Sequence, residues 1–122
     1  MDVDGEWINQ NGSILEIKVG ESGEISGWYC SRKGRAASGK RYPLSGVKSD
    51  ELLAFHVNWK DDAQDIHAIT SFTGRCVESP EPAIHTMWIL ARQYEDVEQT
   101  RPTGAWNAFL TNADVFVRRD VR

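Results

Sequence analysis

Hydrophobic and polar residues alternate in short runs along most of this chain, and turn residues separate the runs. Residues 13–19 are a clear case, because every second side chain of this segment falls on one face of an extended chain. Asn11-Gly12 directly before it is a strong hairpin signal, and residues 20–23 form a second turn. This pattern predicts short antiparallel strands, each with one buried face.

The alternation predicts eight strands, over residues 7–10, 13–19, 24–30, 42–47, 52–60, 66–77, 83–92 and 112–119. Pro43 indicates the start or the edge of its strand, because proline cannot donate a ladder hydrogen bond. The longest connection, 93–111, is expected to include a short helical turn around residues 105–110. Even spacing of short strands is typical of barrels and sandwiches. We predict an all-β fold, an eight-stranded antiparallel up-and-down β-barrel, with residues 1–122 forming a single domain.

The same alternation turns polar side chains toward the interior. The polar residues on the inward faces are Asn9, Ser13, Tyr29, Thr70 and Asp114, and Ser31 continues the parity of Tyr29. A buried polar group without a partner costs roughly 1–3 kcal/mol, so a dry core would not hold this set. We expect most of these groups to converge at one end of the barrel.

The chemistry of these groups suits a ligand with a urea or cyclic amide group. Asn9, Ser13 and Tyr29 can donate hydrogen bonds to a carbonyl oxygen, and Asp114 and Ser31 can accept them from N–H groups. The apolar walls of the pocket are expected to come from Trp59, Phe72 and Trp88. Simpler roles stay open for single residues: a turn contact for Asn9, a core position for Tyr29 and a strand cap for Asp114.

Composition narrows the range of partners. The formal net charge of −4 disfavours nucleic acid, because phosphate binding needs a basic surface. Basic residues do cluster in residues 32–41, which we interpret as a solvated loop. No apolar run approaches the roughly 20 residues that span a bilayer, so we expect no membrane partner. We also expect no signal peptide ahead of the first strand.

Cysteine and histidine positions argue against metal binding and catalysis. Cys30 and Cys76 match no metal or redox spacing, so we expect two free thiols, no metal and no cofactor. The alternation turns all three histidines, His56, His67 and His85, toward the outside of the barrel, so we expect no histidine in the pocket. Without a base beside a pocket nucleophile, we expect that the protein is not an enzyme.

An ordered set of motifs resembles the avidin–streptavidin family of biotin-binding proteins. The opening residues Gly5-Glu6-Trp7-Ile8-Asn9-Gln10-Asn11-Gly12-Ser13 are similar to the family's Gly-x-Trp-x-Asn-x-x-Gly-Ser. The further matching segments are Gly27-Trp28-Tyr29, Val57-Asn58-Trp59-Lys60, Phe72-Thr73-Gly74-Arg75-Cys76 and Thr86-Met87-Trp88-Ile89-Leu90. The resemblance runs from Gly5 to about Arg119, which is nearly the whole chain.

The resemblance implies a role for each pocket residue. Asn9, Ser13 and Tyr29 would bind the ureido oxygen of biotin, and Asp114 and Ser31 its ureido nitrogens. Thr70 would lie near the thioether sulfur, and the bicyclic ring and aliphatic chain would be lined by Trp59, Phe72, Trp88 and Leu90. The family also has a tryptophan, here Trp106, that closes the pocket of a neighbouring subunit.

The chain departs from the family pattern near the ligand's carboxylate. Ala68 stands where the family usually has Ser or Thr, so one hydrogen bond to the tail is expected to be lost. The basic loop is expected to replace it, through Arg32, Lys33 or Arg35. The family disulfide that would use Cys76 is also expected to be absent, because residues 1–4 contain no cysteine.

The resulting hypothesis is high-affinity, non-catalytic sequestration of biotin. The alternative is the same barrel with another small ligand, either lipocalin-like or with weakened biotin affinity. We expect a homo-oligomer, a tetramer rather than a dimer, because outward residues of the last two strands are apolar (Met87, Ile89, Ala91, Ala113, Val115 and Val117). We also expect a secreted protein, although a trimmed or a cytosolic chain would fit the same sequence.

Overall fold

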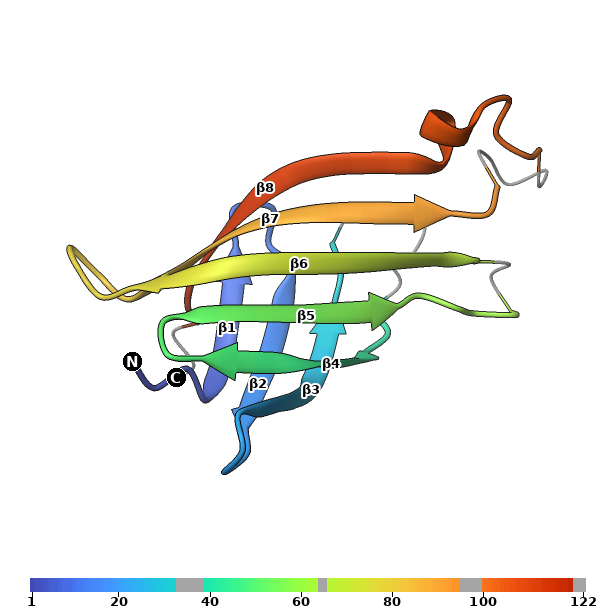
Figure 1. The fold of residues 1–122 in the computed structure, drawn as a ribbon. Helices are drawn as coiled ribbons and strands as arrows, with labels where there is room; N and C mark the ends of the chain where they lie inside the picture. The colour runs from blue at the N-terminus through green and yellow to red at the C-terminus, as the bar shows by residue number, and fades with distance from the viewer. Residues whose placement is uncertain (33–38, 64–65, 95–99, 120–122) are drawn as a thin grey trace.

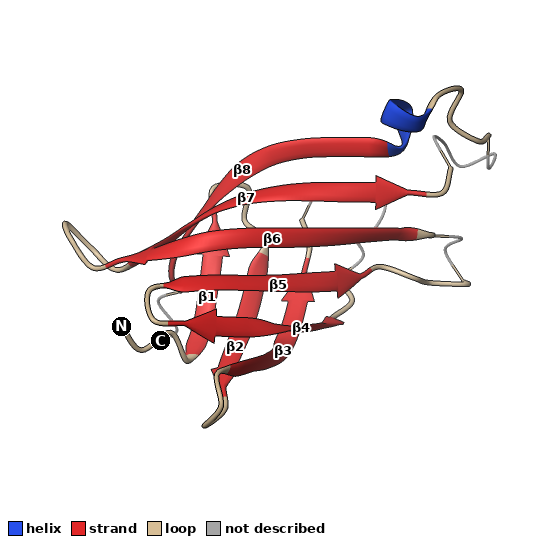
Figure 2. Ribbon diagram, in the orientation of Figure 1, coloured by secondary structure: helices blue, strands red, loops and turns tan. Residues whose placement is uncertain are grey.

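The computed structural model describes residues 1–32, 39–63, 66–94 and 100–119. Its strands are β1 (Gly5–Asn9), β2 (Ile14–Val19), β3 (Glu24–Cys30), β4 (Tyr42–Ser49), β5 (Leu52–Asn58), β6 (Ala68–Val77), β7 (Ala83–Arg92) and β8 (Phe109–Arg118). A short 3-10 helix, η1 (Ala105–Ala108), precedes β8 (Figure 2).

The strands form one closed barrel in which each strand pairs antiparallel with its neighbours in the chain (Figure 1). Closure comes from β1 and β8, where Trp7 lies opposite Arg118 and Asn9 opposite Phe116. The prediction of an eight-stranded antiparallel up-and-down β-barrel is therefore confirmed. Pro43 is the second residue of β4, so its place at a strand start is also confirmed.

Side chains that alternate inward form the core of the barrel. Trp7 is fully buried, and its indole N–H donates to the carbonyl oxygen of Val3 at 2.9 Å. Phe72 lies at the centre of an aromatic cluster, with ring centroids 4.6 Å from Phe55 and 5.5 Å from Tyr29. Stacked and edge-on rings of this kind fill the interior of the barrel beside the pocket.

The predicted strand limits needed two main corrections. The last strand begins at Phe109, three residues before the predicted start at Asn112, because the helical turn ends at Ala108. The sixth strand begins at Ala68 and not at Ile66, since Ile66 instead pairs with Asp61 in an isolated bridge. Both corrections concern the end of the barrel that holds the pocket.

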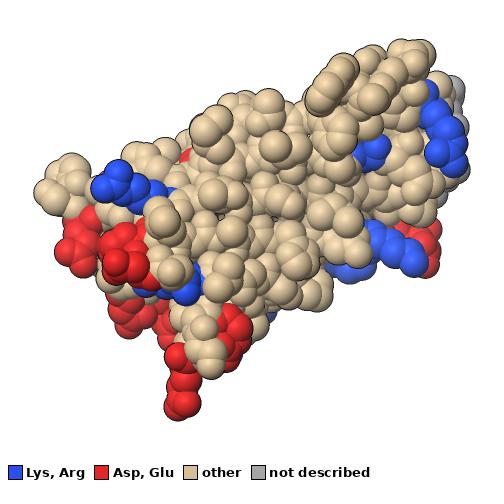
Figure 3. Space-filling model, in the orientation of Figure 1, with Lys and Arg blue, Asp and Glu red and all other residues tan. Residues whose placement is uncertain are grey.

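Outward-facing apolar side chains gather on β7 and β8. Met87 is 68% exposed and Ile89 54% exposed, and the register places Met87 opposite Ala113 on β8. Figure 3 shows this side of the molecule as a broad surface with few charged side chains, which lie mainly toward its edges. The described part of the chain contains no helix that is long and apolar enough to cross a membrane.

Candidate ligand-binding site

One end of the barrel contains a pocket with a volume of about 540 Å³. It lies where β1, β3, β5 and β7 end, because its wall includes Asn9, Ser31, Trp59 and Arg92. Ten of the predicted site residues line it together, namely Asn9, Ser13, Tyr29, Ser31, Trp59, Thr70, Phe72, Trp88, Leu90 and Asp114. A cavity of this size and composition suits a small organic ligand.

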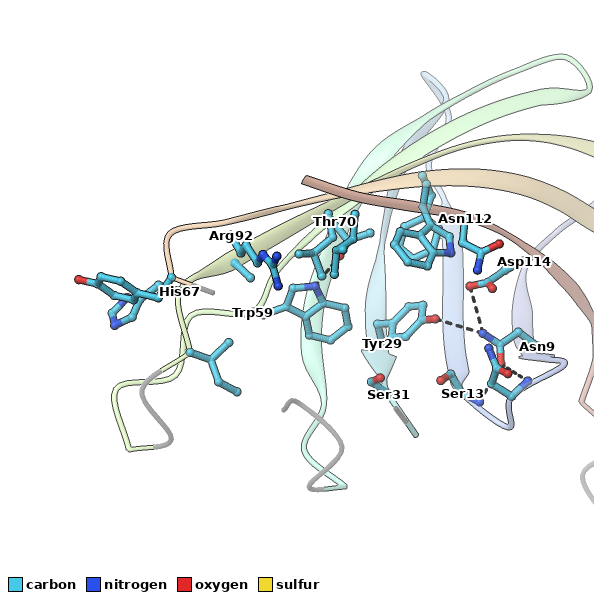
Figure 4. A pocket seen from close by; sticks show the side chains of 18 residues that line it. Asn9, Ser13, Tyr29, Ser31, Trp59, His67, Thr70, Arg92, Asn112 and Asp114 are labelled. Carbon is cyan, nitrogen blue, oxygen red and sulfur yellow. Dashed lines mark hydrogen bonds between the residues drawn. The ribbon is translucent and has the colours of Figure 1, made fainter. Parts of the chain in front are cut away.

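Asn9 joins the β1–β2 turn to the polar end of the pocket. Its Oδ1 accepts hydrogen bonds from the backbone N–H groups of Asn11 at 3.0 Å and Ser13 at 2.9 Å. Its Nδ2 donates to Oδ2 of Asp114 at 3.2 Å and lies 3.5 Å from the Tyr29 hydroxyl (Figure 4). The turn therefore fixes the orientation of the amide, and the amide in turn holds Asp114.

The carboxylate of Asp114 is held from a second side by Gln10. Gln10 Nε2 donates to Asp114 Oδ1 at 2.7 Å, while Gln10 Oε1 accepts from the backbone N–H of Val115 at 3.0 Å. Asp114 is buried and comes from β8, so β1 and β8 must pair correctly to form this arrangement. Sequence parity did not indicate Gln10, because it follows β1 and faces outward.

Tyr29 provides a buried hydroxyl beside Asp114. Burial, and secondarily the negative charge of Asp114, raises the pKa of Tyr29 well above its usual range. Its ring packs edge-on against Trp59, with centroids 5.3 Å apart. The hydroxyl therefore stays protonated and can donate a hydrogen bond to a ligand at any physiological pH.

Two further hydroxyl groups already have protein partners. Ser13 Oγ accepts from the backbone N–H of Arg32 at 2.9 Å, and a side-chain hydrogen bond also links Ser13 to Tyr29. Thr70 Oγ1 accepts from the indole N–H of Trp59 at 2.8 Å, which fixes the plane of this aromatic wall. On β7, the strand that pairs with β6, the indole Nε1 of Trp88 is buried without an acceptor among the described residues.

Three predicted residues lie elsewhere or outside the description. Lys33 and Arg35 fall outside the described residues. Trp106 does not line the pocket and is 85% exposed, with its ring centroid 6.3 Å from that of Phe109. The role of Trp106 toward a neighbouring subunit therefore stays a prediction.

The structure also places in the pocket wall residues that the alternation along the strands did not assign to it. The expectation that no histidine lines the pocket is wrong: His67 does so, because it precedes β6 and does not follow the alternation of that strand. The other lining residues outside the predicted set of binding residues are Asn11, Ile66, Ala68, Arg92, Tyr94, Leu110 and Asn112, of which Ala68 was already expected near the ligand's carboxylate. Arg92 and Asn112 share the inward parity of Trp88 and Asp114, so the sequence did carry a signal for them.

A sequence model of the Avidin family matches residues 1–119. The chain belongs to the avidin family. Afifavidin from Afifella pfennigii is 31% identical over 93 residues, a match that covers 75% of this chain and 58% of that protein. The chain thus spans less than two thirds of the length of this avidin-family relative.

Solved structures of avidin-like proteins share the barrel. The rhizavidin–biotin complex is 26% identical, with a TM-score of 0.79, and the match covers 99% of this chain and 95% of that chain. Apo shwanavidin is 25% identical, with a TM-score of 0.80, over 99% of this chain and 100% of that chain. The barrel of this chain therefore matches those of avidin-like proteins over almost the whole chain.

Proposed function

We propose that this protein binds biotin non-covalently in the pocket at the end of the barrel. The observation that carries the proposal is the polar array around Asp114. Hydroxyl and amide donors of Asn9, Ser13 and Tyr29 surround the place of one ligand oxygen, while the Asp114 carboxylate offers an acceptor for an adjacent N–H. A ureido group needs this combination of donors and acceptors.

The rest of the pocket supports the same ligand. Trp59 and Phe72 are buried, and with Trp88 and Leu90 they form an apolar wall beside the polar array. This wall suits a sulfur-containing ring and an aliphatic chain. Membership of the avidin family and the similarity to the rhizavidin–biotin complex support the assignment independently.

The arrangement favours retention of biotin and not its conversion. Figure 4 shows His67 at the opposite end of the pocket from Ser13 and Ser31, so this imidazole is not placed to activate either hydroxyl. We therefore propose a non-catalytic, sequestering role. Family membership also supports a homo-oligomeric protein that acts outside the cell, and release of the protein into the medium of its source cells would test that location.

Calorimetric titration with biotin tests the proposal. Wild-type protein should bind one biotin per chain. Asp114→Ala should weaken binding by about 1–3 kcal/mol or more, because a ureido N–H loses its acceptor in a buried site. Glu21→Ala, which removes an exposed carboxylate from the turn between β2 and β3, is the matched control and should leave the affinity unchanged. No heat with biotin for the folded wild-type protein would refute biotin binding.

A further inference from the structure

The pocket carries opposite charges at its two ends. Asp114 belongs to the polar end, whereas Arg92, the last residue of β7, belongs to the mouth. Figure 4 shows Arg92 pointing toward Trp59 and Thr70, on the other side of the pocket from Asp114. A ligand that fills the pocket therefore meets an acceptor at its inner end and a cation at its outer end.

The surroundings of Arg92 leave its guanidinium free to bind an anion. The register places Arg92 directly opposite Ala68, whose methyl group leaves space for the longer side chain. Arg92 Nε and Nη2 donate to the carbonyl oxygen of Asn107 at 3.1 and 2.8 Å. These bonds use two of the five N–H donors of an arginine. Within the described parts of the chain, Arg92 forms no ion pair with a carboxylate.

We propose that Arg92 is a specificity-determining residue that binds the carboxylate at the tail of the ligand. The inference rests on the proposed function, since biotin carries a ureido ring at one end and a carboxylate on a flexible chain at the other. With the ureido group at Asp114, the chain runs along Trp59 and Thr70 toward the mouth. A planar guanidinium held by Asn107 is pre-oriented to bind a carboxylate there.

This assignment replaces the basic loop as the anion-binding element. Arg32, the described member of the predicted loop set, is exposed and does not line the pocket. Its Cγ lies 3.6 Å from the position that a Cβ on Gly12 would take, so the side chain follows the outside of the hairpin. A surface cation of this kind is screened by salt and contributes little, whereas Arg92 is half-buried in the pocket wall.

The test compares biotin with its neutral primary amide in wild type, Arg92→Gln and Arg92→Lys. Dissociation constants come from displacement calorimetry at about 20 mM and about 0.5 M salt. Wild type should prefer the acid on the order of tenfold at low salt, as expected for one partly exposed charge-assisted hydrogen bond. Arg92→Gln should bind acid and amide equally, with unchanged affinity for the amide, and Arg92→Lys should keep part of the preference.

Arg75→Gln removes an exposed cation from β6 outside the pocket and should keep the full preference. Equal binding of acid and amide by wild type would overturn the role of Arg92 but not biotin binding. Loss of binding for both ligands in Arg92→Gln would show that Arg92 only holds the Asn107 turn. Failure of wild type to bind either ligand would refute the proposed function itself. If Arg92→Gln does not fold, two measurements still test the role of Arg92. They are the salt dependence of the wild-type preference for the acid over the amide, and the same preference in Arg92→Lys.

Discussion

Single residues in this pocket combine a structural role with a role toward the ligand. Asn9 is the clearest example, because its oxygen stabilises the turn through Asn11 and Ser13 while its nitrogen faces Asp114. The turn contact and the site position looked like alternatives in the sequence, and the structure contains both. Because the oxygen of the Asn9 amide is held by the hairpin backbone, the backbone also fixes the direction of its nitrogen toward Asp114.

We expect Tyr29 to make the free energy of unfolding fall as the pH rises above about 10. Its raised pKa means that the folded protein keeps the phenolic proton above the ordinary value of about 10, at which the unfolded chain loses it. The contribution is complete below about pH 10 and is lost as pH rises further. Between about pH 8 and about pH 11, wild type should lose about 1 kcal/mol more of its free energy of unfolding in urea than Tyr29→Phe, and nearly all of that difference should arise above about pH 10. Parallel losses in both proteins would contradict this.

At the scale of elements, regular strands made the fold and most of the site predictable. Tyr29 and Thr70 lie inside strands, so their inward direction follows from alternation alone. Prediction failed where a strand stops. His67 lies one residue before β6, and the start of β8 depends on pairing with β7, for example Ala91 with Phe109, which no local pattern records. Gln10 was missed for the same reason, since its partners lie on a strand at the other end of the chain.

Gly27 shows how one position controls the approach of two strands. It adopts φ +153°, and a Cβ at this position would lie 1.8 Å from the carbonyl oxygen of Glu16 on β2. Gly27→Ala should therefore separate β2 from β3 and lower the free energy of unfolding by about 2 kcal/mol or more. Ser26→Ala, the exposed neighbour on β3, should change it by less than about 0.5 kcal/mol. Equal urea midpoints for the two variants would disprove this account.

At the scale of the whole molecule, the apolar outer face of β7 and β8 supports the proposed homo-oligomer. A monomer that exposes such a patch would associate, and closed symmetric assemblies are the common solution. Met87→Lys combined with Ile89→Lys should reduce the oligomer size measured by light scattering at micromolar concentration. Ser26→Lys on β3 is the control and should leave the size unchanged. A wild-type protein that is monomeric with and without biotin would refute the assembly.

Trp106 offers a separate test of the same assembly. An indole that is 85% exposed in a single chain has most of its apolar surface available for a neighbouring subunit. Trp106→Ala should weaken biotin binding while the oligomer size stays the same. Unchanged affinity would leave the association through β7 and β8 intact but remove the role of Trp106 in the adjacent pocket.

The closure of the barrel between its first and last strands also decides how the molecule can be attached to a surface. β1 begins and β8 ends side by side, where the backbone N–H of Arg119 donates to the carbonyl oxygen of Glu6 at 3.0 Å. The pocket opens where β1 ends and β8 begins, so Gly5 at the start of β1 and Arg118 at the end of β8 lie on the side of the barrel away from the mouth. A tether joined to either end would present the pocket outward, and joining it after Arg119 would also preserve the ion pair between the Met1 ammonium and Glu51. On a sensor chip prepared in this way, the pocket would face the solution and stay accessible to the ligand.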